Sequence, residues 1–445
     1  MLAETNTATL PQILDRLNDA RRQTDELFAI VNRDAIYDRP IPERHRIIFY
    51  VGHLEAFDWN LLRERLFNLE SFDPKFDRLF AFGIDPVDGG LPSDQPTDWP
   101  SLEEVRQYVA KIRESLDRAL AEVGFSDTEL RDGTDFSPNV LLNVAIEHRL
   151  MHAETLAYML HQLPLQKKIQ KPMEAELKAE AFKAEIVKVP AGIATLGLCR
   201  AQGDFGWDNE FEQQSTEVPA FSIDRYMITN GEFLKFIEAD GYKNRTLWTA
   251  PNWDWKQEHG ISSPAFWNRM DGRWFLRTMF DHLDLPLDWP VYVSHAEASA
   301  YAKWTGKALP TEAQWHRAAY GTLRGKENIY PWGSKKPSAK LGNFDFERWD
   351  PGPVNAFPEN KSAFGVEGLL GNGWEWTSTV FSPLPDFKPF SFYLGYSADF
   401  FDGKHYVIKG GSTRTAASML RRSFRNWFQT HYQYVYAGFR CVSNS

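Results

Sequence analysis

Three histidines have the residue type and the spacing of a metal site. His148 and His152 are four residues apart in NVAIEHRLMHAETLAYML, which places both imidazoles on one face of a helix. His53 lies in FYVGHLEAFDWNLL, among aromatic neighbours that indicate a largely buried setting. Three neutral imidazoles can hold a transition metal and leave coordination positions open for substrate and oxygen. From the residues alone, the alternative is that these are ordinary core or surface histidines, which an isolated HxxxH pair more often is.

Four amphipathic segments predict the helices that would position these histidines. Apolar residues recur in them at intervals of three and four. Ser101, with Glu104 three residues later, predicts a capped helix start, and the Ser137-Pro138 pair predicts another. The predicted helices span residues 9–31, 46–69, 101–123 and 137–163. We therefore expect a four-helix bundle over residues 1–165 that carries the candidate metal ligands.

The amino-acid composition changes after the predicted bundle. Residues 166–184 are polar and charged, and we interpret them as a linker. From residue 185 to residue 445, Gly, Pro and Trp are frequent, and the runs IVKVPAG, HYVIKGGS and YAGFRCV predict short strands. One clear helix is expected from about His295 to Thr305. The whole chain is therefore expected to be α+β, with a helical bundle followed by a domain rich in loops.

Composition excludes several classes of protein. The 445 residues carry a net charge of −10, which argues against a general nucleic-acid-binding protein. The chain has only 2 cysteines, so we expect no disulfide framework and a reducing compartment. We find no signal-peptide pattern and no apolar run of transmembrane length. We therefore expect a cytoplasmic protein that does not act at a membrane.

The second half resembles a known family. The stretches FSIDRYMITNGEFLKFIEADGY, WPVYVSHAEASAYAKWTGKALPTEAQWHRAA, GLLGNGWEWTSTVF, VIKGGS and AGFRCV resemble the sulfatase-modifying-factor (formylglycine-generating-enzyme) domain, which has a C-type-lectin-like fold. The three-histidine bundle resembles DinB-like bundles. A DinB-like bundle fused to such a domain is similar to the ergothioneine-biosynthetic sulfoxide synthases and their relatives, which include the ovothiol-pathway and selenoneine synthases. The resemblance covers nearly the whole chain.

The resemblance implies an iron(II) centre held by His53, His148 and His152. In the family this centre uses O2 to join a chalcogen to the imidazole ring of hercynine (N-α-trimethylhistidine). The implied partners are therefore small molecules, namely hercynine, O2 and a cysteine or selenium donor. Glu147 and Glu154 lie near two of the histidines, and we interpret both as solvated helix charges.

The resemblance also implies substrate-binding and catalytic residues in the second half. Asn426 and Trp427, in RRSFRNWF, match an Asn-Trp pair that contacts hercynine in the family. Trp427 could attract the trimethylammonium group by cation–π interaction, and its alternative role is that of a packed core residue. Tyr393 and Tyr396, in FSFYLGYSADFF, occupy the loop where relatives carry a tyrosine near the iron. The choice between the two tyrosines stays open.

Departures from the family bear on the donor. Members that use γ-glutamylcysteine carry two arginines after the second bundle helix, whereas FGIDPVDGGLPSDQPTDWP contains neither Arg nor Lys. Those members also carry an acidic and a basic residue where this sequence has Phe428 and Tyr432. We therefore expect free cysteine or a selenium donor such as a selenosugar, and these two stay open. Asp85 and Asp88 could hydrogen-bond a sugar.

The sequence leaves several alternatives in function and metal. A formylglycine-generating oxidase works through a pair of cysteines, and Cys199 and Cys441 do not match the positions of that pair. An ovothiol-type 5-histidylcysteine sulfoxide synthase and a DinB-type metal-dependent thiol transferase are the alternatives in function, and zinc or nickel is the alternative in metal. Finally, GNFDFERWD and GNGWEW resemble places where relatives hold a structural Ca2+, with Asn343 and Asp345 as candidate ligands. Turns formed by Asn and Asp without a metal are commoner.

Overall fold

The structure is a computed structural model that describes residues 9–83, 91–126 and 128–444. Asp85 and Asp88 lie outside the described residues. The chain divides into two compact units. The first contains residues 1–171 and 201–205, and the second contains residues 172–200 and 206–445. Residues 169–185, which include most of the predicted linker, form no helix or strand.

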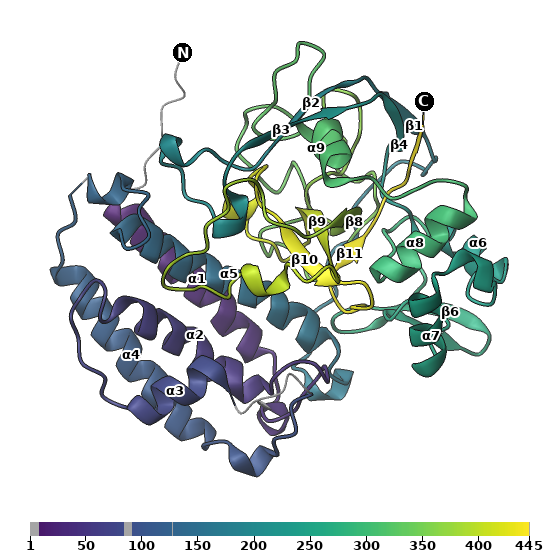
Figure 1. Ribbon diagram of the computed structural model, residues 1–445. Coiled ribbons are helices and arrows are strands. Elements are labelled where there is room, and N and C mark those ends of the chain that lie inside the picture. The colour runs from purple at the N-terminus through teal and green to yellow at the C-terminus, as the bar shows by residue number, and fades with distance from the viewer. Residues whose placement is uncertain (1–8, 84–90, 127, 445) are drawn as a thin grey trace. The chain divides into compact units, whose positions relative to one another are not determined.

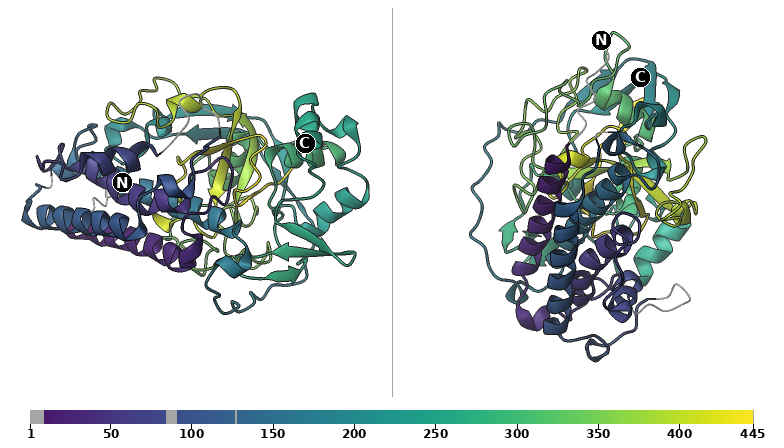
Figure 2. Two further views of the ribbon diagram at one scale, coloured as in Figure 1. Left: turned by 90° about the horizontal axis from the view of Figure 1, so that it is seen from below. Right: turned by 90° about the vertical axis from the view of Figure 1, so that its left-hand side faces the viewer.

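The first unit is a bundle of α-helices that run alongside one another (Figures 1 and 2). Its helices are α1 (Leu10–Ala29), α2 (Ile47–Leu62), α3 (Pro74–Phe82), α4 (Leu102–Glu122) and α5 (Pro138–His161). Helix α2 contacts α3, α4 and α5, and α1 packs along α5. The four helices predicted from the apolar periodicity are confirmed, although α2 ends at Leu62 and the predicted stretch 63–69 forms turns and irregular chain. Helix α3 was not predicted from the sequence, although Asp73 caps it by accepting a hydrogen bond from the Phe76 backbone N–H, and Pro74 is its first residue.

Local sequence explains where two of these helices begin. Ser101 and Glu104 form the reciprocal capping box that the sequence predicts at the start of α4. Ser137 caps α5 by accepting a hydrogen bond from the Val140 backbone N–H, and Pro138 follows it as the first helical residue. Helices α2 and α5 are buried on nearly all sides. Most polar side chains on these two helices are therefore buried.

The second unit mixes short strands with short helices. Its strands are β1 (Ile186–Val189), β2 (Gly192–Leu196), β3 (Gln214–Val218), β4 (Phe221–Asp224), β5 (Trp267–Met270), β6 (Arg273–Arg277), β7 (His282–Asp284), β8 (Gly373–Val380), β9 (His405–Gly411), β10 (Asn426–Gln429), β11 (Ala437–Gly438) and β12 (Val442–Asn444). They form four sheets, with the orders β1-β4-β12, β10-β9-β8-β11, β2-β3 and β5-β6-β7. All pairs are antiparallel except β11 with β8. This mixture of helix and sheet confirms the α+β prediction.

The helices of the second unit are α6 (Asn230–Glu238), α7 (Ala250–Glu258), α8 (His295–Trp304) and α9 (Glu312–Tyr320). Helix α8 is the one predicted from the sequence. Trp315 of α9 is fully buried in a cluster of apolar side chains from β2, β4 and the loop before β8, and its Nε1–H donates to Glu375 Oε2 at 2.9 Å. No helix among the described residues is long and apolar enough to cross a lipid bilayer.

Candidate functional site

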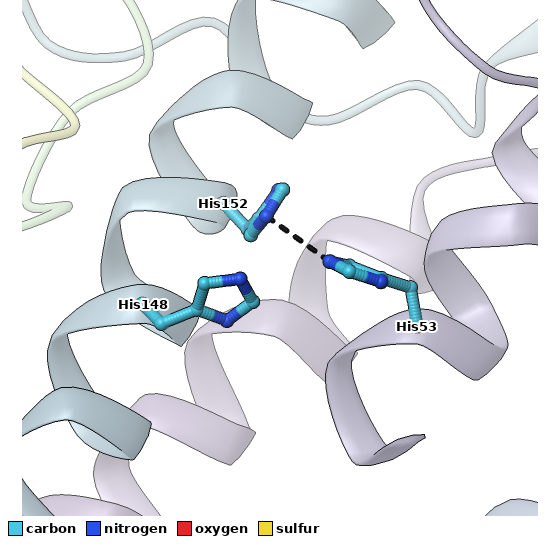
Figure 3. A group of neighbouring side chains, drawn as sticks. All are labelled: His53, His148 and His152. Atoms are coloured by element: carbon cyan, nitrogen blue, oxygen red, sulfur yellow. Dashed lines mark hydrogen bonds between the residues drawn. The ribbon is translucent and has the colours of Figure 1, made fainter. Parts of the chain in front are cut away.

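His53, His148 and His152 gather inside the first unit. His53 projects from α2, and His148 and His152 project from consecutive turns of α5 (Figure 3). One ring nitrogen from each lies within 4.8 Å of the others. The Nε2 atoms of His53 and His152 are 3.3 Å apart. Two imidazole nitrogens at this separation are close enough to share a proton or to bind one metal ion.

The backbone and two aromatic rings orient these imidazoles. His53 Nδ1 lies 2.7 Å from the Phe80 carbonyl oxygen, so Nδ1–H donates and Nε2 keeps its lone pair. Phe57 stacks on His148 with ring centroids 3.4 Å apart and an interplanar angle of 10°. Phe49 stacks on His53 at 4.6 Å and 25°. A hydrogen bond from a ring nitrogen to a carbonyl is the usual way in which proteins fix the tautomer of a metal-binding histidine.

Burial keeps the three imidazoles neutral. Desolvation lowers the pKa of His53 to about 4, and it lowers the pKa values of His148 and His152 well below the ordinary value. A positive charge on a neighbouring histidine also lowers the pKa values of His148 and His152. Neutral imidazole is the form that binds a metal. Nδ1 of both His148 and His152 is buried without a hydrogen-bond partner among the described residues. Three neutral imidazoles, two of which have a ring nitrogen without a hydrogen-bond partner among the described residues, fit a divalent transition metal.

A buried ion network joins the two helices that carry the histidines. Arg149, which is fully buried, donates from Nη2 to Asp58 at 2.6 Å and to Glu55 at 2.8 Å. Arg113 of α4 also donates to Glu55, from Nε at 2.8 Å. Burial by itself raises the pKa of Glu55, but the charges of Arg149 and Arg113 outweigh it and lower this pKa to about 2. This network was not predicted from the sequence. The signal was available, because charged residues in a helix as apolar as IIFYVGHLEAFDWNLL require buried partners.

Two acidic residues beside the ligands are not solvated. Glu147 and Glu154 are only 2% and 6% exposed, so the interpretation of both as solvated helix charges is wrong. Burial on nearly all sides of α5 is the reason, because even positions away from the histidine face contact other parts of the protein.

The second unit brings together Tyr396 and Trp427. Trp427, in β10, meets the Tyr396 ring edge-on, with centroids 5.6 Å apart and an interplanar angle of 79°. Its indole also stacks on Phe381 at 4.1 Å and 7°. Tyr393 lies beside Tyr396, with ring centroids 5.5 Å apart. Asn426 immediately precedes Trp427, and its Oδ1 accepts the Trp427 backbone N–H at 2.8 Å. The four residues therefore form one aromatic and polar group within this unit, and the three histidines form another within the first unit.

The candidate calcium ligands differ from each other. Asp345 is exposed, and its Oδ1 accepts the Ala417 backbone N–H at 2.8 Å. Asn343 is 1% exposed, and its Oδ1 has no hydrogen-bond partner among the described residues. Its Nδ2 donates to Asn372 Oδ1 at 3.1 Å. Bound calcium stays a prediction, and Asn343 fits it better than Asp345 does.

Comparison with known proteins agrees with this architecture. Residues 16–156 match the DinB superfamily, and residues 172–445 match the sulfatase-modifying factor enzyme 1-like domain. The chain is 37% identical to the hercynine oxygenase of Mycolicibacterium smegmatis over 82% of its own length and 83% of that protein. The chain belongs to the hercynine oxygenase family. It is also 42% identical to the hercynine oxygenase of Mycolicibacterium thermoresistibile, over 55% of each protein. A match to ergothioneine biosynthesis protein 1 of Schizosaccharomyces pombe, at 30% identity, spans 93% of this chain and 54% of that one.

The family membership confirms the resemblance drawn from the motifs, and with it the fold class. A DinB-type bundle is followed by a sulfatase-modifying-factor domain, as expected. The cysteines are both free, with Cys441 buried and Cys199 partly exposed.

Proposed function

We propose that this chain is a non-haem iron(II) enzyme that uses O2 to join sulfur or selenium to the imidazole carbon of hercynine. The observation that carries the proposal is the cluster of three neutral histidines, two buried and one half-buried, in a chain of the hercynine oxygenase family. With cysteine as donor, one C–H and one S–H bond are replaced by a C–S bond. O2 then supplies the sulfoxide oxygen and one molecule of water, so the reaction is a four-electron oxidation.

His53, His148 and His152 are proposed to hold the iron. Bound Fe(II) would supply the activation of O2, because three nitrogen ligands leave coordination positions open. The Phe80 carbonyl keeps the proton of His53 on Nδ1, and so directs Nε2 toward the other two histidines. Phe49 and Phe57 cover the faces of two of the rings, which excludes water and limits ring rotation.

Residues of the second unit are proposed to recognise hercynine. Asn426 uses its Oδ1 to accept a backbone hydrogen bond, so its amide NH2 is the group available to donate to the substrate carboxylate. Phe381 covers one face of the Trp427 indole, so a trimethylammonium group would have to approach the opposite face. Tyr393 and Tyr396 are proposed as the catalytic candidates. Tyr396 is favoured because it contacts Trp427 directly.

The donor is proposed to be free cysteine or a selenium compound rather than γ-glutamylcysteine. Phe428 and Tyr432 stack on each other with ring centroids 5.1 Å apart and an interplanar angle of 16°. An aromatic pair therefore stands where γ-glutamylcysteine-using members carry opposite charges. Residues 82–100 also contain no basic side chain that could bind the glutamyl carboxylate.

Parallel turnover assays test this proposal. The protein is reconstituted anaerobically with Fe(II), then mixed with O2, hercynine and one donor, and products are identified by mass spectrometry. The donors are cysteine, γ-glutamylcysteine and a selenosugar, and a parallel series replaces hercynine with histidine. A sulfur adduct of hercynine would establish a sulfoxide synthase, and a selenium adduct alone would establish a selenoneine synthase.

Controls separate the alternatives. Turnover of histidine but not hercynine would indicate the ovothiol-type reaction, and thiol transfer without O2 would indicate a transferase. His152→Ala should bind no iron and give no product while the protein stays folded. Full activity of this variant would refute the assignment of the metal site. Absence of any product from hercynine, with every donor, would refute the substrate.

A further inference from the structure

A buried turn in the second unit contacts the loop that carries both candidate tyrosines. The turn consists of Trp207 and the short 3-10 helix Asp208–Glu210. Asp208 Oδ1 accepts a hydrogen bond from Ser397 Oγ at 2.6 Å, and the Phe390 backbone also hydrogen-bonds to this carboxyl group. The Trp207 indole stacks on Tyr396 at 4.1 Å with an interplanar angle of 24°. The turn therefore contacts residues 390–397 at both ends, through Asp208, and at the Tyr396 ring, through Trp207.

The same turn contacts the segment that leads into Asn426. Glu210 accepts hydrogen bonds from Arg421 Nε at 2.8 Å and from Ser423 Oγ at 2.7 Å. The carbonyl oxygen of Asn209 accepts from Arg425 Nη1 at 3.3 Å. Arg425 is buried and is held from its other side by Glu312, through Nε at 2.9 Å. Residues 207–210 are thus tied to the residue directly before Asn426.

We propose that the turn formed by residues 207–210 is a positioning element that sets Tyr396 against Asn426 and Trp427, and that Asp208 is its positioning residue. The inference rests on the proposed function for the roles of Tyr396, Asn426 and Trp427, whereas the contacts of the turn do not depend on it. Two segments that lie far from this turn in the sequence, residues 390–397 and 421–425, both contact it, and Tyr396 and Trp427 meet edge to face. Small errors in the placement of substrate-binding groups are costly in rate, so a rigid connection of this kind has a function.

The chemistry of Asp208 argues against a purely structural role. Its side chain has no solvent exposure, and Oδ2 has no hydrogen-bond partner among the described residues. Burial, partly opposed by Ser397 and the two backbone donors, raises the pKa of Asp208 to about 6. Asparagine would accept the same hydrogen bond from Ser397 without burying a charge. The ionised carboxylate binds its donors more strongly than a neutral amide does, which fits a requirement to hold the loop tightly.

The pH dependence follows from this arrangement. The charged or titratable groups that face Asp208 are Arg200, which also pairs with Glu212 at 3.1 Å, and Tyr393, whose pKa is raised by burial and by the Asp208 charge. Asp208 becomes protonated as the pH falls through about 6, and its bonds to Ser397 and Phe390 weaken. We therefore expect kcat/KM for hercynine to fall by about tenfold between pH 7.5 and pH 5.

Asp208→Asn tests the inference in the full-length iron-loaded enzyme. At pH 7.5 this variant should lose about tenfold in kcat/KM for hercynine, mainly through KM, and its activity should depend less on pH below 7 than that of the natural protein. Ser397→Ala, which leaves the carboxylate in place, should show a similar loss, and the double variant should be little worse than either alone. Asp254→Asn, at an exposed position, is the matched control and should leave the pH profile unchanged. An unaltered pH profile and KM in Asp208→Asn would overturn the inference.

Two further readouts do not need turnover. Peptides that cover residues 390–400 should exchange amide hydrogens faster in Asp208→Asn, because the loop loses a strong hydrogen-bond acceptor. The thermal midpoint at pH 8 should nevertheless rise by about 4 °C, because the variant no longer buries a charge. Iron affinity should stay unchanged, because the histidines belong to the other unit. Slow exchange in the variant would refute the positioning role even if hercynine proved to be the wrong substrate. Conversely, failure of every donor assay together with fast exchange would refute only the proposed function.

Discussion

Replacing Gly52 with alanine should weaken metal binding more than it weakens folding. Gly52 immediately precedes His53 on α2, and a Cβ atom there would lie 2.4–2.5 Å from three ring carbons of Phe80. Phe80 has no solvent exposure and packs against Phe76, Tyr108 and Trp99, so its ring cannot simply rotate away. The Phe80 backbone must shift instead, and its carbonyl oxygen is the acceptor that orients His53.

The two energies can be estimated separately. Overpacking a core costs about 1–3 kcal/mol, whereas alanine in place of glycine inside a helix contributes about 1 kcal/mol in the opposite direction. The net loss of stability should therefore be only about 0–2 kcal/mol. Loss of a hydrogen bond that orients a metal ligand typically lowers metal affinity by about 10–100-fold, which corresponds to about 1.4–2.8 kcal/mol.

The assay is an anaerobic titration of Fe(II), or of Co(II) as a spectroscopic substitute, combined with urea denaturation of the metal-free protein. Gly124→Ala is the matched control, because no atom lies within 4 Å of the Cβ position there, and it should leave the metal affinity unchanged and raise stability by at most about 1 kcal/mol. Phe80→Leu added to Gly52→Ala should restore part of the affinity, since the smaller side chain relieves the contact while the carbonyl remains. A Gly52→Ala protein that is more stable by about 1 kcal/mol and binds metal normally would refute the role assigned to Phe80.

Three further outcomes are expected. Arg149→Met should lower the free energy of unfolding by about 3–5 kcal/mol by urea denaturation, because buried carboxylates lose their partner, and adding Glu55→Gln should recover part of that loss. His295, whose pKa burial lowers to about 3, stays neutral when folded but takes up a proton below about 6.5 when unfolded. The free energy of unfolding should therefore fall by about 2 kcal/mol from pH 7 to pH 5 on its account, and His295→Phe should flatten that dependence. Phe428→Asp combined with Tyr432→Arg should raise turnover of γ-glutamylcysteine relative to cysteine by about tenfold in competition assays. An unchanged ratio would show that these two residues do not determine the choice of donor.

Local patterns in the sequence were sufficient for the main helices and for two of the three histidines. The periodicity of apolar residues and the caps at Ser101 and Ser137 are local properties, so α4 and α5 begin where the sequence predicts. The spacing of four residues places His148 and His152 on one helix face whatever surrounds them. The order of motifs in the second half likewise pointed to the sulfatase-modifying-factor domain, which the comparison with known proteins confirms.

Packing between distant segments determined the rest. Periodicity says which face of α2 is apolar, but only the packing of α2 against α5 brings His53 within reach of His152. Helix α3 was missed because it is short, yet its Phe80 carbonyl orients His53. The sequence indicates that charged residues in these apolar helices need buried partners, but it does not identify the partners of Arg149, which are carboxylates about 90 residues away in the sequence.

The same division applies to the second unit. The family motifs predict roles for Tyr396 and Trp427, but not which residues hold them in place. Only the tertiary structure shows that Asp208 holds the tyrosine loop and that Glu210 holds the segment before Asn426, since these contacts join residues about 190–210 positions apart. Local propensity encodes the conformation of a segment and the faces that it presents. Which faces meet is decided by burial and by the pairing of polar groups, and these depend on the whole chain.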